Sequence, residues 1–174
     1  MTFEDISASK IKFFYTSLQE EKATFRQPLS NLLLAKIVVT HEEENQVIGL
    51  AGITKNHMFF LVVKSSHQNK GIGQSLARKI IREAIKKNCS HIALYVNKLN
   101  NKAVYIYKKL GFRSLYYLWE DNQTYLYMIL PLNFTGMIIA VFYKIVNMIF
   151  SKIDRKSLKS RKIFSLWNKI IRNT

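Results

Sequence analysis

Apolar residues recur at helical spacing near the start of the chain. The residues that share this spacing are Ile6, Ile11, Phe14, Tyr15 and Leu18. A period near 3.6 residues is typical of a helix with one buried face, so the pattern predicts a helix over residues 5–20. A second short helix is predicted over residues 30–34, because Pro28 just before it suits a helix start.

The apolar pattern then changes to that of β-strands. Residues 35–40 and 46–54 predict two strands, joined by the acidic segment 41–45 as a solvent-exposed hairpin turn. Residues 57–63 form an almost continuous apolar run, which predicts a central strand covered on both faces.

Helices and strands alternate in the region that follows. Residues 73–87 combine one apolar stripe with a basic face, the pattern of an amphipathic helix. Residues 91–96 predict a strand, and residues 100–110 predict a short helix ended by Gly111. The last predicted strands form a closing pair at residues 113–119 and 123–130. This order predicts an α/β (α+β) fold, with a mixed central sheet flanked by helices.

Charge divides the chain into two parts. The 174 residues carry a formal net charge of +16, which favours anionic partners such as phosphate-rich cofactors, nucleic acid or anionic lipid. Residues 1–130 hold 18 Lys/Arg and 10 Asp/Glu, and the remaining residues hold nine Lys/Arg and one acid. We therefore expect a domain over residues 1–131 and a helical, basic and apolar extension over residues 132–174.

Cysteine content and the N-terminal residues indicate the compartment. The single cysteine, Cys89, allows no internal disulfide, and the first residues lack the charged and apolar regions of a secretory signal. A reducing, cytosolic environment is the simplest expectation.

A glycine-containing junction, Q-N-K-G-I-G at residues 68–73, connects the predicted central strand to the basic helix. Unpaired N–H groups at a helix start form an anion site, and glycine lets a phosphate approach the backbone closely. The alternative is an ordinary turn in which glycine only serves the geometry. Leu76 stands where a Rossmann fingerprint needs its third glycine, and the G-K-[ST] of a Walker loop is absent.

Two blocks of sequence carry a resemblance to a known family: V-K-S-S-H-Q-N-K-G-I-G at residues 63–73 and L-Y-V-N-K-L-N-N-K-A-V-Y-I-Y-K-K-L-G-F at residues 94–112. They resemble the GNAT superfamily of N-acetyltransferases. Residues 63–73 are similar to motif A of that family, Q/R-x-x-G-x-G/A. Residues 94–112 are similar to its later pattern, L-x-V-x-x-x-N-x-x-A-x-x-x-Y-x-x-x-G-F. The resemblance covers residues 1–130, with Ser65 as a departure where many relatives have proline.

The resemblance implies acetyl-coenzyme A (acetyl-CoA) as cosubstrate, no metal, and a set of cofactor-binding positions. A backbone N–H near Val63 would polarise the thioester carbonyl, and Asn100 would contact the cofactor or hold the following helix. Tyr107 would protonate the leaving thiolate, although a core packing role remains its alternative. The implied cofactor-binding residues are Leu61, Val62, Val63, Gln68, Asn69, Lys70, Gly71, Ile72, Gly73, Gln74, Asn100, Ala103 and Tyr107.

A general base is not evident in the sequence. His57 and Glu120 are candidates by placement alone, so we expect water to take the proton from the amine. The remaining histidines, His41, His67 and His91, are expected at the surface. Cys89 is expected to pack at a helix end rather than to carry an acetyl group.

The C-terminal extension lies beyond the resemblance, and three interpretations remain open for it. From residue 137 the pattern predicts an apolar helix with a narrow polar stripe at Lys144, Asn147, Ser151 and Asp154 or Arg155. A basic stretch and an amphipathic segment at residues 163–172 follow. We favour an anchor on an anionic membrane surface through residues 137–172. A spanning helix over residues 132–150 is disfavoured by its polar residues, and packing on the domain or in a homodimer is the third interpretation.

The sequence thus predicts an N-acetyltransferase that acts by direct attack of a primary amine in a ternary complex, peripheral on the inner face of a membrane. The alternative is a degenerate GNAT domain that senses cofactor or serves as a scaffold. Nucleic acid is a lesser option, because the extension is too apolar. The acceptor amine is not encoded in any pattern that we can read.

Overall fold

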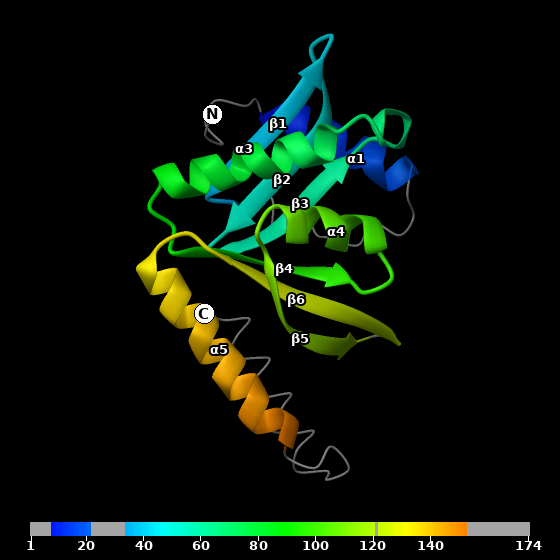
Figure 1. Ribbon diagram of the computed structural model, residues 1–174. Helices are drawn as coiled ribbons and strands as arrows, with labels where there is room; N and C mark the ends of the chain where they lie inside the picture. Colours follow the sequence, from blue (N-terminus) through cyan, green and yellow to red (C-terminus); the bar gives the residue numbers. More distant parts are fainter. Residues whose placement is uncertain (1–7, 22–33, 121, 153–174) are drawn as a thin grey trace.

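The structure is a computed structural model that describes residues 8–21, 34–120 and 122–152 (Figure 1). The predicted short helix at residues 30–34, apart from Leu34, and the extension from residue 153 onward lie outside these described residues. The elements in chain order are α1 (Ala8–Glu21), β1 (Ile37–Glu43), β2 (Gln46–Thr54), β3 (His57–Val63), η2 (Ser65–His67), α3 (Ile72–Lys86), β4 (His91–Asn97), α4 (Asn101–Lys109), β5 (Arg113–Glu120), β6 (Gln123–Pro131) and α5 (Phe134–Lys152).

The strands form one six-stranded mixed sheet in the order β1-β2-β3-β4-β6-β5. All neighbouring pairs are antiparallel except β3 with β4, which run parallel. The predicted α/β class with a mixed central sheet is confirmed. The first hairpin is tighter than expected, because Glu44 and Asn45 both adopt positive φ and a two-residue turn suffices. The strands therefore extend into the acidic segment.

Helices cover both faces of the sheet. α3 and α4 lie over the same face (Figure 1) and share the largest buried cluster with alternate residues of the strands, such as Leu94 and Val96. On the opposite face, α1 packs on β1 to β3 and α5 packs beside β4 to β6. The sheet is therefore the middle layer of three.

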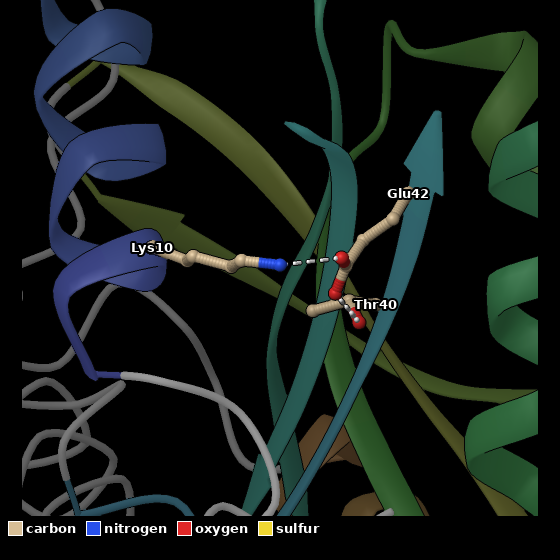
Figure 2. Close-up of polar contacts among 3 residues, drawn as sticks. All are labelled: Lys10, Thr40 and Glu42. Atoms are coloured by element: carbon tan, nitrogen blue, oxygen red, sulfur yellow. Dashed lines mark hydrogen bonds and ion pairs between the residues drawn. The ribbon is translucent and has the colours of Figure 1, made fainter. Parts of the chain in front are cut away.

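A polar contact ties α1 to the edge strand β1. Lys10 Nζ lies 3.0 Å from Glu42 Oε2, and the Thr40 hydroxyl donates to the other carboxylate oxygen at 3.4 Å (Figure 2). Because both charged side chains are partly exposed, this pair contributes at most about 1 kcal/mol. The position of α1 depends mainly on its buried apolar residues, such as Ile11 and Phe14.

The helix α5 begins three residues earlier than the apolar pattern predicts. Asn133 caps it, since its side-chain oxygen accepts a hydrogen bond from Gly136 N at 3.0 Å. Asn147, a member of the predicted polar stripe, is directed toward the sheet, because its amide donates to Leu115 O at 3.2 Å. Within the described ranges, no helix combines the length and apolar character needed to cross a membrane.

Candidate active site

A cleft opens where the parallel strands β3 and β4 separate. The two strands are in register only at His57 and Ala93, where Ala93 N donates to Asn56 O at 2.8 Å. Beyond this point they diverge and enclose a cleft of about 590 Å³. Its walls come from β3, the following loop, the start of α3, β4 and α4.

Backbone amides of β3 point into this gap. Lys64 N donates to Ile48 O of β2 at 2.9 Å, and N–H directions alternate along a strand. The N–H of Val63 is therefore directed away from β2, toward the side that β4 has left. Leu61 has the same orientation, whereas Val62 faces β2 and packs its side chain on the α1 cluster. Of these three predicted positions, Leu61 and Val63 line the cleft.

The loop after β3 presents the start of α3 to the cleft. Gln68 Nε2 donates to Val63 O at 3.0 Å, which folds the loop back on the strand end. Gly71 has φ +82°, a conformation that favours glycine, and as the N-cap residue of α3 it has no side chain to cap the helix. The first-turn amides of α3 are thus available to an anion. Lys70 is exposed and lies outside the cleft wall.

The start of α4 forms the wall opposite this loop. Asn100 caps α4, because its side-chain oxygen accepts from Ala103 N at 3.1 Å, and both residues line the cleft. Lys102 Nζ donates to the Asn69 side chain and so connects α4 to the loop. The sequence reasoning missed Lys102, although its place in the first turn of the predicted helix is a usable signal.

Tyr107 lies on the inner side of α4 and lines the cleft. Its side chain is 8 % exposed and packs edge-on against Phe112 at a ring distance of 5.5 Å. Burial raises the pKa of Tyr107 to about 12, since ionisation would leave a charge in an apolar surrounding. The hydroxyl therefore remains a proton donor throughout the physiological range.

No aspartate or glutamate appears among the described residues that line the cleft. Glu120 is exposed at the end of β5, away from the cleft wall. His57 lies beside the cleft, and burial, aided by His91 and Lys55, lowers its pKa to about 4. His57 is therefore neutral at pH 7.

His91 was expected at the surface, and this is wrong. It is buried, because the first turn of α5 packs closely over the start of β4: a Cβ on Gly136 would lie only 3.3 Å from that of His91. Burial lowers its pKa, and its Nδ1 contacts the Ser90 hydroxyl at 2.9 Å. Cys89 is buried at the end of α3, as expected, and is not part of the cleft wall.

The cleft is lined from both faces of the sheet. Leu94 and Val96 point toward α3 and α4, whereas Tyr95 points to the opposite face, where α5 packs. Phe59 joins Tyr95 in the wall; it is the extra residue of a β-bulge, since Met58 and Phe60 pair with consecutive residues of β2. The sequence reasoning did not include Tyr95, although strict alternation along β4 separates it from its neighbours. The gap therefore gives access from two sides.

The comparisons with known proteins agree with this geometry. Residues 3–112 match the family described as the acetyltransferase (GNAT) family. The thialysine N-epsilon-acetyltransferase of Sus scrofa is 40 % identical over 55 residues, which cover 32 % of this chain and 32 % of the relative. The chain thus matches about a third of the length of this curated relative.

Solved structures share the fold at low sequence identity. The ribosomal-protein-S18-alanine N-acetyltransferase of Escherichia coli has a TM-score of 0.61 at 18 % identity, over 74 % of this chain and 91 % of that one. The yncA acetyltransferase structure from Salmonella typhimurium, with its cofactor acetyl-CoA, has a TM-score of 0.53 at 21 % identity, over 60 % and 69 %.

The chain belongs to the GNAT family of acetyltransferases, because the family match covers well over half of its length. That family consists of acetyltransferases, and the Salmonella typhimurium structure holds acetyl-CoA as its cofactor.

Proposed function

We propose that this protein transfers the acetyl group of acetyl-CoA to a primary amine by direct attack in a ternary complex. The observation that carries the proposal is the gap between β3 and β4, where the Val63 N–H and the uncapped start of α3 converge. A relative named for N-epsilon-acetylation of thialysine supports an amine as acceptor.

The cofactor is proposed to lie along the cleft with its pyrophosphate at the start of α3. The amides near Gly71 and Gly73 suit a phosphate, because the dipole and the free N–H groups of a helix start both favour negative charge. The thioester then lies beside β3, with its carbonyl oxygen toward the Val63 N–H. Asn100 acts here mainly by holding α4, the helix that carries Tyr107.

The reaction that we propose has three steps. The amine nitrogen attacks the thioester carbon, and the developing oxyanion accepts a hydrogen bond from Val63 N–H. The nitrogen loses a proton to water, since no carboxylate among the described residues lines the cleft. The carbon–sulfur bond breaks, and Tyr107 donates its hydroxyl proton to sulfur and regains one from solvent.

The raised pKa of Tyr107 qualifies this last step. A thiol has a pKa near 8.5, about 3.5 units below that of Tyr107, so complete proton transfer between the isolated groups is unfavourable. Hydrogen-bond donation to the sulfur as charge develops is therefore the larger part of the contribution that we propose.

Direct attack is favoured over an acetyl-enzyme intermediate. Cys89 is buried in the main core and is absent from the cleft wall, so it does not reach a cofactor bound there. The acceptor is proposed to enter from the face where Phe59 and Tyr95 line the gap, opposite α3 and α4.

We also propose that the enzyme works at the inner face of a membrane, as a domain of residues 1–131 with an extension of residues 132–174. The support is compositional: the extension combines nine basic residues and one acid with many apolar side chains.

A label-transfer experiment tests the catalytic proposal. The full chain is incubated with acetyl-labelled CoA and a host-cell extract that includes membranes, and lipid, protein and small polar fractions are then separated. Label on an amine supports the proposal, and label in the lipid or membrane-protein fraction supports the membrane placement.

A second candidate is a degenerate domain that binds cofactor without transfer. It is favoured by the absence of a carboxylate among the described residues that line the cleft. Saturable acetyl-CoA binding with no labelled product in any fraction would select this candidate over catalysis.

A further inference from the structure

The helix α5 exposes large apolar side chains on the side that faces away from the sheet. We call this surface the outer face of α5. Its members are each about half exposed or more: Met137, Ile138, Val141, Phe142, Ile145 and Met148. Their spacing of three and four residues places them on one side of the helix.

Packing accounts for the opposite side of α5. Ala140 is buried, the Tyr143 and Tyr127 rings pack edge-on with their centroids 6.0 Å apart, and the Asn147 amide donates to Leu115 O. Gly136 lies so close to β4 that an added Cβ would be 1.9 Å from Ser90 O. These contacts fix the rotation of α5, so the outer face stays turned outward.

A surface helix normally shows polar residues to solvent. Here Lys144 is the only charged residue between Phe134 and Met148. A continuous apolar surface of this kind marks a contact site with a protein or a membrane.

We propose that the outer face of α5 lies on an anionic membrane surface. This assignment rests on the membrane placement proposed above and identifies the surface that makes the contact. Charge decides between the occupants: the chain has a net charge of +16, which repels a second copy and attracts anionic lipid. Nine of the 27 basic residues lie beyond position 130, in the same part of the sequence as α5.

The geometry has a consequence for the acceptor. α5 packs on the sheet face to which Tyr95 points, and Tyr95 lines the cleft. A membrane bound by α5 therefore lies on the side of the gap from which the acceptor is proposed to enter. An amine on a lipid or on a membrane protein fits this arrangement.

Vesicle flotation tests the assignment with a matched pair of substitutions in the full chain. Phe142→Glu changes the outer face, where Phe142 is 56 % exposed, and Phe13→Glu makes the same change on α1, where Phe13 is 68 % exposed. The probe is a vesicle of phosphatidylcholine with about one third phosphatidylserine, compared with pure phosphatidylcholine.

We expect the wild type to float with the anionic vesicles. Phe142→Glu should weaken partition about tenfold or more, because the burial of one large apolar side chain is lost and a negative charge is added. Phe13→Glu should change partition less than threefold. Acetyl transfer to a soluble amine without vesicles should be equal in all three proteins, which separates this test from that of the catalytic proposal.

Two results would overturn the assignment. If the wild type stays unbound, or if Phe142→Glu floats as well as the wild type, the outer face does not contact lipid. Sedimentation then identifies the occupant. A wild-type dimer that Phe142→Glu dissociates would assign the face to a second copy, and an unbound monomer would assign it to residues 153–174.

Discussion

The Tyr107 hydroxyl is the most direct point at which to test the proposed chemistry. Tyr107→Phe removes one oxygen and keeps the ring, so the edge-on contact with Phe112 should persist. We expect kcat to fall while the affinity for acetyl-CoA stays within about twofold. The reason is that the hydroxyl is proposed to act only when negative charge develops on sulfur.

The size of the loss follows from the environment of the hydroxyl. A hydrogen bond to a charged group contributes about 1.5–3 kcal/mol, which corresponds to about 10- to 150-fold in rate. Full general-acid catalysis would contribute up to about 10⁴-fold. Because the pKa of Tyr107 is raised to about 12, donation should dominate, and we expect a loss near 10²-fold.

Steady-state kinetics with the acceptor identified by label transfer provides the assay. Tyr105→Phe is the matched control on the same helix, since Tyr105 is 61 % exposed and lies outside the cleft wall; its kcat should match the wild type. The activity of the wild type should not fall through Tyr107 ionisation below about pH 11. If Tyr107→Phe keeps kcat within threefold of the wild type, the hydroxyl has no part in the mechanism.

Three further predictions concern the loop, the helix cap and pH. Gly71→Ala should destabilise the fold by about 1 kcal/mol, because φ is +82° at this position, and should raise the Kd of CoA measured by calorimetry. Gly73→Ala should lower the free energy of unfolding less, because Gly73 lies in the helix and has room for a Cβ. Asn100→Ala should lower the free energy of unfolding by about 1 kcal/mol in urea titration through loss of the cap, and an unchanged value would exclude the capping role. The pKa of His57 is lowered from 6.5 to about 4, so between pH 4 and pH 6.5 the unfolded chain binds more protons than the folded chain. The contribution of neutral His57 to the free energy of unfolding is therefore complete above pH 6.5 and is lost as the pH falls toward 4. The loss should reach about 3 kcal/mol, and His57→Phe should reduce the slope of the unfolding free energy against pH. An equal slope would show that His57 does not cause this pH dependence.

Local patterns predicted the strands and the α-helices α1, α3 and α4 of the sheet domain, because their apolar periodicity is clear; they did not predict the short helix η2. Gly111 directly follows the last residues of α4 and has φ +95°, the conformation expected of a glycine that ends a helix. The predicted helix boundaries were wrong where a capping side chain, rather than the apolar pattern, determines them. Asn133 caps α5, and the start of the helix was predicted too late because the apolar pattern carries no information about a polar cap.

Tertiary contacts explain what sequence reasoning missed in the candidate site. The loop and Tyr107 were predicted from the resemblance of two sequence blocks to the GNAT family. The place of Tyr95 in the cleft wall depends instead on which strands lie beside β4 and where β3 departs from it. The burial of His91 likewise depends on α5, which lies more than forty residues further along the chain. Neither the place of Tyr95 in the cleft wall nor the burial of His91 can be predicted from a local sequence pattern.

The helix α5 links the candidate site to the proposed membrane contact. Its inner side meets a tyrosine cluster: Tyr143 contacts Tyr127, Tyr127 stacks with Tyr116 at 4.7 Å, and the Tyr116 and Tyr95 hydroxyls lie 3.3 Å apart. Tyr95 in turn lines the cleft. These packed rings connect the inner side of α5 with the side of the cleft from which the acceptor is proposed to enter. If lipid binding shifts α5 against the sheet, the first measurable effect should be on the KM for the acceptor. The affinity for acetyl-CoA should stay unchanged, because the amides that are proposed to bind the cofactor lie on β3 and α3. Equal acceptor KM values with and without anionic vesicles would show that membrane contact and acceptor binding are independent.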